Sequence, residues 1–124
     1  MSRGPPSRRA LADSLPIARG RGTIQLAGGG PESLCSFTIV SALPVTFVRV
    51  AYSPRLYAPV AVLAGDFQDE LARLGQIRQH EVISRELWLR SRHGSWRFFR
   101  LIAGGLEELN REGQPLDGQA AAHA

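Results

Sequence analysis

The chain has 124 residues, of which 44% are hydrophobic, and it carries a formal net charge of +4. This length allows one small domain with a single core, and no apolar run is long enough to cross a bilayer. All 15 basic residues are arginines, which excludes mechanisms that need an amine, such as a Schiff base or a phosphate-loop lysine. Arginine is well suited to hold phosphate or carboxylate, although a GC-rich coding bias explains the missing lysines equally well.

Residues 1–31 are rich in proline, glycine and arginine and contain a single acid, Asp13. This composition predicts a basic, disordered arm, in which residues 8–15 and 23–26 form at most a short helix and a short extra strand. Such an arm adds non-specific affinity for nucleic acid, but the composition of an ordinary tail explains it as well. No apolar segment follows the N-terminal arginines, so we expect no signal peptide and a cytoplasmic location.

Two strands are predicted next. The segments 34–40 and 45–52 are rich in β-branched and aromatic residues, and a short link joins them as a hairpin. The second segment is apolar on both faces apart from Arg49, so we expect a central strand in which Arg49 has a partner or reaches the edge. Cys35 is the single cysteine, and we expect a small buried residue rather than a reactive thiol.

One main helix follows the two strands. Hydrophobic residues recur at spacings of three and four from Val60 to Leu74, which predicts an apolar stripe along four turns. Gly65 interrupts this pattern and is expected to mark a bend or a close approach to the sheet. Three acids among residues 66–70 lie on the other face, which is therefore a poor surface for nucleic acid.

A second hairpin is predicted for the stretch ISRELWLRSRHGSWRFFRLI, residues 83–102. It contains both tryptophans, and His93 and Gly94 have the chemistry of the two central residues of a tight turn. Residues 106–109 are predicted to add a last short strand.

These elements predict an α/β or α+β domain over residues 32–113. Its four- to five-stranded mixed sheet is built from the two hairpins, and the main helix packs on one face. Residues 1–31 and residues 114–124 are predicted to be disordered.

A two-residue turn determines which side chains of the second hairpin share a face. In that register Arg90 faces Arg97 and Trp88 faces Phe99, and both pairs lie on the same side of the sheet. Two arginines placed opposite each other repel unless an anion or an acidic side chain lies between them. This arrangement is the strongest chemical signal in the sequence.

The first functional hypothesis is therefore a non-catalytic domain that associates with nucleic acid. Arginines bind phosphates, and an aromatic side chain on the same face stacks on a base. Such binding depends on salt and little on sequence, and it does not distinguish DNA from RNA. The predicted nucleic-acid-binding residues are Arg85, Trp88, Arg90, Arg92, Arg97, Phe99 and Arg100.

Two alternatives remain open. In a purely structural interpretation, which the sequence slightly favours, Trp88 and Phe99 are core residues and the arginines pair with acids such as Glu86. In the second functional hypothesis, the Trp88/Phe99 face is buried against a protein partner or in a homodimer.

No group of residues has the spacing of a catalytic or metal site. His80, His93 and His123 lie in a helix-end loop, a hairpin turn and a tail, without a suitably spaced carboxylate. We therefore predict no catalytic residue, no metal and no cofactor.

A strand hairpin holding Phe47-Val48-Arg49-Val50-Ala51, followed by a helix and a further strand, resembles the core of the restriction-endonuclease-like nucleases. These nucleases, which include the Holliday-junction-resolvase-like enzymes, form the PD-(D/E)XK family. The stretch RELWLRSRHGSWRFFR also resembles small uncharacterised archaeal proteins. The resemblance covers residues 33–109 and implies a nuclease-like fold.

The resemblance also implies where catalytic residues would stand. In active members an aspartate begins the first strand, an acid followed two residues later by lysine occupies the second, and together they bind a divalent metal and activate water. These positions fall on Ser36, Arg49 and Ala51, which lack the carboxylates, and an arginine repels the metal ion. The resemblance therefore implies a degenerate domain with a binding or scaffolding role, and a metal-dependent nuclease is the least favoured function.

Overall fold

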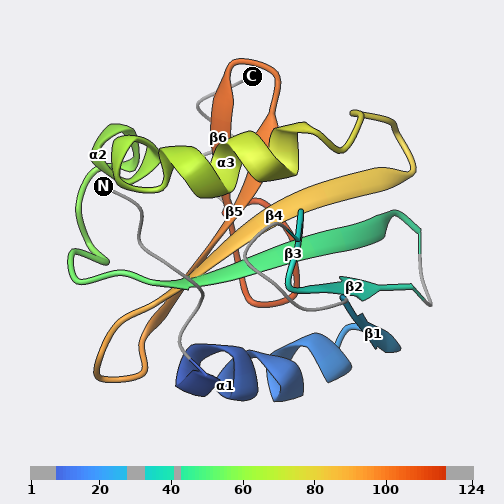
Figure 1. Ribbon diagram of the computed structural model, residues 1–124, viewed down its shortest axis with the longest axis horizontal. Coiled ribbons are helices and arrows are strands. Elements are labelled where there is room, and N and C mark those ends of the chain that lie inside the picture. Colours follow the sequence, from blue (N-terminus) through green and yellow to red (C-terminus); the bar gives the residue numbers. More distant parts are fainter. Residues whose placement is uncertain (1–7, 28–32, 41–42, 117–124) are drawn as a thin grey trace.

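The computed structural model describes residues 8–27, 33–40 and 43–116 (Figure 1). Within these residues six strands form one sheet, and helices lie on both of its faces. None of the described helices has the length and apolar character needed to span a membrane. In chain order the elements are α1 (Arg8–Arg19), β1 (Ile24–Leu26), β2 (Phe37–Ile39), β3 (Val45–Tyr52), α2 (Val60–Asp66), α3 (Gln68–Gly75), β4 (Ile83–Arg90), β5 (Trp96–Ile102) and β6 (Gly105–Leu109).

The sheet is mixed, and its strands lie in chain order from β1 to β6. Every neighbouring pair is antiparallel except β3 and β4, which run parallel from Val45↔Ile83 to Tyr52↔Arg90. A parallel pair needs a crossover connection, and α2 and α3 supply it. The predicted mixed sheet of an α+β fold is confirmed, with more strands than the predicted four to five.

Alternating side chains of the strands divide the core into two layers. Val48, Trp88 and Phe98 lie in the layer beneath α1, whereas Leu87 and Phe99 lie in the layer beneath α2 and α3 (Figure 1). All five residues are at most 5% exposed. The central strands are thus covered on both sides, as predicted for β3, and a second helix layer covers the face that the prediction left open.

α1 and β1 belong to the fold, whereas residues 1–31 were predicted to be a disordered arm with at most a short helix at 8–15 and a short strand at 23–26. α1 packs Ala10, Ser14 and Ala18 against the sheet, each at most 1% exposed. These residues recur every four positions and so share one face of a helix. Their side chains are too small to give a strong hydrophobic pattern, and Pro16 lies on the exposed side, where the helix continues through it.

The folded part therefore extends beyond the predicted residues 32–113 at both ends. At the C-terminal end, Pro115 forms a bridge with Leu109 of β6. Residues 1–7, 28–32 and 117–124 lie outside the described residues.

The predicted main helix is divided into α2 and α3. α2 ends at Asp66 and α3 begins at Gln68, and Phe67 between them has φ −113° and ψ 32°. The interruption thus lies two residues after the predicted bend at Gly65. Phe67 is fully buried, so it anchors the junction of the two helices in the core.

Candidate nucleic-acid interface

The β4–β5 hairpin has a three-residue loop instead of the predicted two-residue turn. The N–H of Ser91 donates to the carbonyl of Ser95 at 2.9 Å, and Gly94 has a φ of 91°. A glycine in the left-handed region at the end of a three-residue loop is a common hairpin geometry. The hydroxyl of Ser91 also accepts hydrogen bonds from the N–H groups of His93 and Ser95, at 3.3 and 3.0 Å.

The longer loop shifts the register by one residue, which moves every side chain of β5 to the other face. Leu89, not Arg90, is opposite Arg97. Arg90 lies on the α1 side and Arg97 on the α3 side, and Trp88 and Phe99 are separated in the same way. The predicted face that combines both arginines with both aromatic residues does not exist in this fold.

Trp88 and Phe99 are core residues, each 0% exposed. The Trp88 ring packs edge-on against Phe37 and Phe98, with centroids 5.5 and 5.1 Å away. Its Nε1 donates to Oε1 of Glu86 at 2.9 Å. Trp88 and Phe99 are therefore core residues, as in the structural interpretation, and their rings are not exposed for base stacking or for a protein partner.

Four of the five predicted phosphate-binding arginines are engaged within the protein, and Arg90 is one of them. Arg85 is 7% exposed and donates to two backbone carbonyls. Arg97 binds Glu108 through hydrogen bonds of 3.0 and 2.7 Å and donates to two carbonyls of the loop before α2. Arg100 binds Glu107 at 3.3 Å and donates to a serine hydroxyl and a backbone carbonyl. These side chains hold the sheet together.

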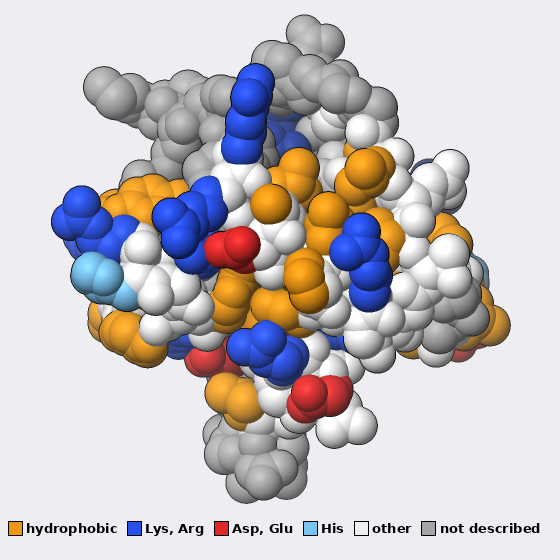
Figure 2. Space-filling model, turned by 90° about the horizontal axis from the view of Figure 1, so that it is seen from below, with side chains coloured by type: hydrophobic (Ala, Val, Ile, Leu, Met, Phe, Trp, Pro, Cys, Tyr) orange, Lys and Arg blue, Asp and Glu red, His pale blue; other side chains and the backbone are white. Residues whose placement is uncertain are grey.

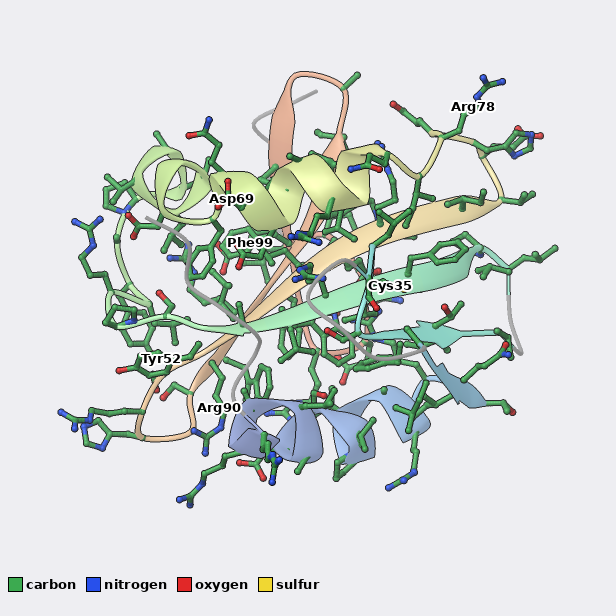
Figure 3. The ribbon with its side chains drawn as sticks, in the orientation of Figure 1. Cys35, Tyr52, Asp69, Arg78, Arg90 and Phe99 are labelled. Carbon is green, nitrogen blue, oxygen red and sulfur yellow. The ribbon has the colours of Figure 1, made fainter. Side chains whose placement is uncertain are left out.

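Arg90 joins the end of β4 to α1. Its Nη2 lies 2.8 Å from Oδ2 of Asp13, and its side chain is 9% exposed. Asp13 is 44% exposed and also lies 4.0 Å from Nε of Arg9. The Nε of Arg90 has no partner within the described part of the chain. This contact holds the N-terminal half of α1 next to the hairpin loop (Figure 3).

The first turn of α1 is basic. Arg8 and Arg9 are both exposed, and no acidic residue lies in this turn. Positive charge at a helix N-terminus opposes the helix dipole and typically costs roughly 0.3–1 kcal/mol. A local loss of stability of this kind is expected where the residues that cause it serve a function.

Further cationic and aromatic groups lie close to this turn. Arg92 and His93 are exposed in the hairpin loop. Tyr52 pairs with Arg90 in the β3–β4 register and is 39% exposed, and Figure 3 shows both residues at the same end of the sheet, near α1. Seen from the α1 side, arginine and histidine side chains gather at the left end of the molecule, next to one acidic side chain (Figure 2). We call this surface the basic end, and it consists of Arg8, Arg9, Tyr52, Arg90, Arg92 and His93, with Asp13 among them.

Of the seven predicted binding residues, the basic end contains Arg92, which is exposed, and Arg90, which is buried and bound to Asp13. The predicted residues did not include Tyr52, and Arg8 and Arg9 were included only as part of a disordered basic arm. The available signal was the spacing of Arg9 and Asp13, four residues apart, which is typical of a helical ion pair.

The positions implied by the nuclease resemblance serve the fold. The hydroxyl of Ser36 accepts a hydrogen bond from the N–H of Val50 at 3.0 Å. Arg49 is 5% exposed and donates to the carbonyl of Ser33 at 2.7 Å, which provides the partner expected for an arginine in a central strand. Ala51 lies in the core layer beneath α2 and α3. Within the described ranges, no three His, Cys, Asp or Glu residues are grouped as metal ligands.

Two buried groups near these positions have shifted pKa values. Burial lowers the pKa of Arg49, the nearby charge of Arg73 lowers it further, and Glu70 raises it. Burial raises the pKa of the Cys35 thiol, while a hydrogen bond to Thr38 and the charge of Arg49 lower it. Cys35 is thus a buried, protonated thiol, which is a poor nucleophile.

Comparisons with protein-family models, with curated proteins and with solved structures found no match. The resemblance to nucleases therefore stays a prediction.

Proposed function

We propose that this protein is a non-catalytic domain that binds nucleic-acid phosphates through the basic end. The observation that carries the proposal is the ion pair between Arg90 and Asp13, which holds the first turn of α1 next to the hairpin loop. Arg8 and Arg9 belong to that turn, and Arg92 belongs to that loop. All three side chains are exposed. The described acid among them, Asp13, is bound by Arg90 at 2.8 Å, so the surface keeps an excess of positive charge.

The chemistry of the basic end suits phosphate. Exposed guanidinium groups bind phosphate oxygens in a fork, and the positive end of the α1 dipole adds to the attraction. The hydroxyl of Tyr52 is available to donate to a phosphate or sugar oxygen. Trp88 and Phe99 are buried, so base stacking on them contributes nothing, and we expect binding that depends on salt and not on sequence.

The order of elements supports the interpretation of a degenerate nuclease-like domain. The hairpin β2–β3, the helices α2 and α3 and the strand β4 follow each other as the resemblance implies. None of Ser36, Arg49 and Ala51 has a carboxylate side chain, which favours a binding role over hydrolysis. The cytoplasmic location and the choice between DNA and RNA stay predictions.

Fluorescence anisotropy with labelled DNA and RNA oligonucleotides tests the proposal. We expect the Arg8→Ala/Arg92→Ala variant to bind at least about tenfold more weakly than the wild type at low salt. We also expect the slope of log K against log salt to fall by about 1.8, because each lost phosphate contact removes about 0.9.

The matched control is the Arg19→Ala/Arg78→Ala variant, which removes the same charge from two other exposed positions. Arg19 lies in the last turn of α1. Arg78 lies in the loop after α3, far from Arg90 (Figure 3). Equal weakening in both double variants would contradict the basic end as the binding surface. No binding by the wild type at low salt would contradict the function itself.

A further inference from the structure

β1 forms one edge of the sheet and leaves backbone groups without partners within the described residues. The N–H of Ala27 and the C=O of Thr23 bond to β2, at 3.2 and 2.9 Å. Hydrogen-bonding groups alternate between the two sides of a strand in an antiparallel pair. The N–H and C=O groups of Ile24 and Leu26 therefore point away from the sheet.

The two edges of the sheet differ in how well they are protected against the addition of another strand. At the β6 edge, Glu107 and Glu108 supply charge, and the chain folds back so that the N–H of Leu116 donates to the carbonyl of Glu108 at 3.2 Å. At the β1 edge, residues 22–27 read Gly-Thr-Ile-Gln-Leu-Ala, with neither a charge nor a proline. Charges and prolines are the usual means of preventing strand addition, so, among the described residues, nothing closes the β1 edge to another strand.

A hydrophobic side chain and a pocket lie next to each other on this edge. Leu26 is 60% exposed. Beside it is a pocket of about 360 Å³, lined by Leu15, Arg19, Gly22, Thr23, Ile24 and Leu26. A leucine that enters this pocket contacts aliphatic side chains from both α1 and β1.

We propose that a second copy of this chain binds at the β1 edge, with the two β1 strands antiparallel and centred on Gln25. In this register Ile24 of each copy is opposite Leu26 of the other copy. Each of these two pairs exchanges backbone hydrogen bonds. All outward N–H and C=O groups of Ile24 and Leu26 then have partners. Leu26 of each copy lies over Ile24 of the other, at the pocket next to Leu15.

The surface favours a second copy because it is complementary to itself under twofold symmetry. Such an interface requires the same patch to supply both the projecting side chain and the pocket. The sheet then continues across both copies, and the two α1 helices lie on the same side of it. This inference does not depend on nucleic-acid binding.

Disulfide trapping tests the register directly. Gln25 faces itself at a site without hydrogen bonds, where the Cα atoms of antiparallel strands are about 4.5 Å apart. That distance is within the range for a disulfide, about 4.4–6.8 Å. We expect Gln25→Cys, made together with Cys35→Ala, to form a covalent dimer under mild oxidation. Ile24→Cys in the same background is the control, because residue 24 of one copy is opposite residue 26 of the other and the two cysteines are not opposite each other. We expect this variant to remain monomeric on non-reducing gels.

Sedimentation of the full chain provides the second test. We expect the mass of the wild type to rise with concentration, and Leu26→Lys to remain a monomer. Val62→Lys, which changes a 36% exposed residue on α2, is expected to dimerise like the wild type. A wild type that stays monomeric up to about 1 mM, the weak end of specific binding, would overturn the inference, as would equal cross-linking at residues 24 and 25.

Discussion

Arg21 and Glu86 form a salt bridge between the segment that follows α1 and the centre of β4. Nη1 of Arg21 lies 2.9 Å from Oε1 of Glu86, and the two side chains are 12% and 1% exposed. The guanidinium also lies over the ring of Trp88, 4.9 Å from its centroid. The Ser84 hydroxyl donates to the other carboxylate oxygen of Glu86 at 3.1 Å. A buried carboxylate in the centre of the sheet is thus matched by a cation from the N-terminal segment.

Replacement of Arg21 by methionine is expected to destabilise the fold by about 3 kcal/mol. The change preserves much of the aliphatic volume but leaves Glu86 as a buried charge without its cation. Urea unfolding, followed by tryptophan fluorescence, measures the loss. Arg9→Met removes an exposed charge and is expected to change the free energy of unfolding by less than about 0.5 kcal/mol. Similar values for the two variants would show that the buried pair is not important for stability.

Gly113 is expected to tolerate no side chain because it packs against Arg21. Its φ is +92°, and an added Cβ would lie 2.7 Å from Nη1 and 2.9 Å from Cζ of Arg21. We expect Gly113→Ala to cost at least about 1–2 kcal/mol. Gly65→Ala is the opposite case, because nothing lies within 4 Å of the added Cβ in an exposed part of α2. That change is expected to stabilise the protein by about 0.5–1 kcal/mol, and thermal unfolding of both variants distinguishes the two outcomes.

The sequence predicted best those elements whose hydrophobic pattern is strong. The observed β3, Val45–Tyr52, has the predicted bounds because nearly all of its residues are apolar. The stripe from Val60 to Leu74 correctly indicated helix against one sheet face. α1 was predicted only as a short helix over residues 8–15 in a disordered arm, because Ala10 and Ala18, which contact the sheet, bury little area and resemble the composition of a tail.

The candidate site was predicted less well because it depends on a single loop. Side-chain types determine that residues 83–102 form a hairpin, but the length of the loop determines the register. Gly94 is compatible with a two-residue or a three-residue loop, and the three-residue loop places Arg90 and Arg97 on opposite faces. No local pattern in the sequence reports that the first turn of α1 lies next to the hairpin loop, because that contact depends on the position of α1.

The packing of α1 predicts different outcomes for two alanines of the same helix. Ala18 is 0% exposed against the sheet, whereas Ala12 is exposed. We expect Ala18→Glu to destabilise the fold by several kcal/mol, because it buries a charge without a partner. Ala12→Glu is expected to be close to neutral. Equal stabilities of the two variants in urea would contradict the position of α1.

The Cys35 thiol is expected to make stability depend on pH at the alkaline end. Burial raises its pKa in the folded state, whereas in the unfolded chain the pKa is about 8.5. Below that pH both states keep the proton, so Cys35 contributes no pH dependence. Above it the unfolded chain loses the proton while the folded state keeps it, so stability falls as pH rises.

The slope attributable to Cys35 is at most about 1.4 kcal/mol per pH unit. Urea midpoints of the wild type and of Cys35→Ala, measured from pH 7 to pH 10, isolate this contribution, and the alanine variant is expected to lose less stability over that interval. A thiol reagent at pH 8 is expected to modify Cys35 at least about tenfold more slowly in the native protein than in urea. Equal rates in the two conditions would contradict its burial.

Arg97 and Arg92 are expected to have opposite roles although they lie in the same hairpin. Arg97 binds Glu108 and two backbone carbonyls and lies over the ring of Phe99, 5.0 Å from its centroid. Its replacement by alanine leaves these acceptors without a donor, so we expect a loss of about 3 kcal/mol in the free energy of unfolding. Arg92 is exposed, so its replacement by alanine is expected to leave stability unchanged and to weaken nucleic-acid binding. Urea unfolding and fluorescence anisotropy on the same two variants test both statements. Weaker nucleic-acid binding by a folded Arg97→Ala protein would show that the interface lies on the α3 side of the sheet.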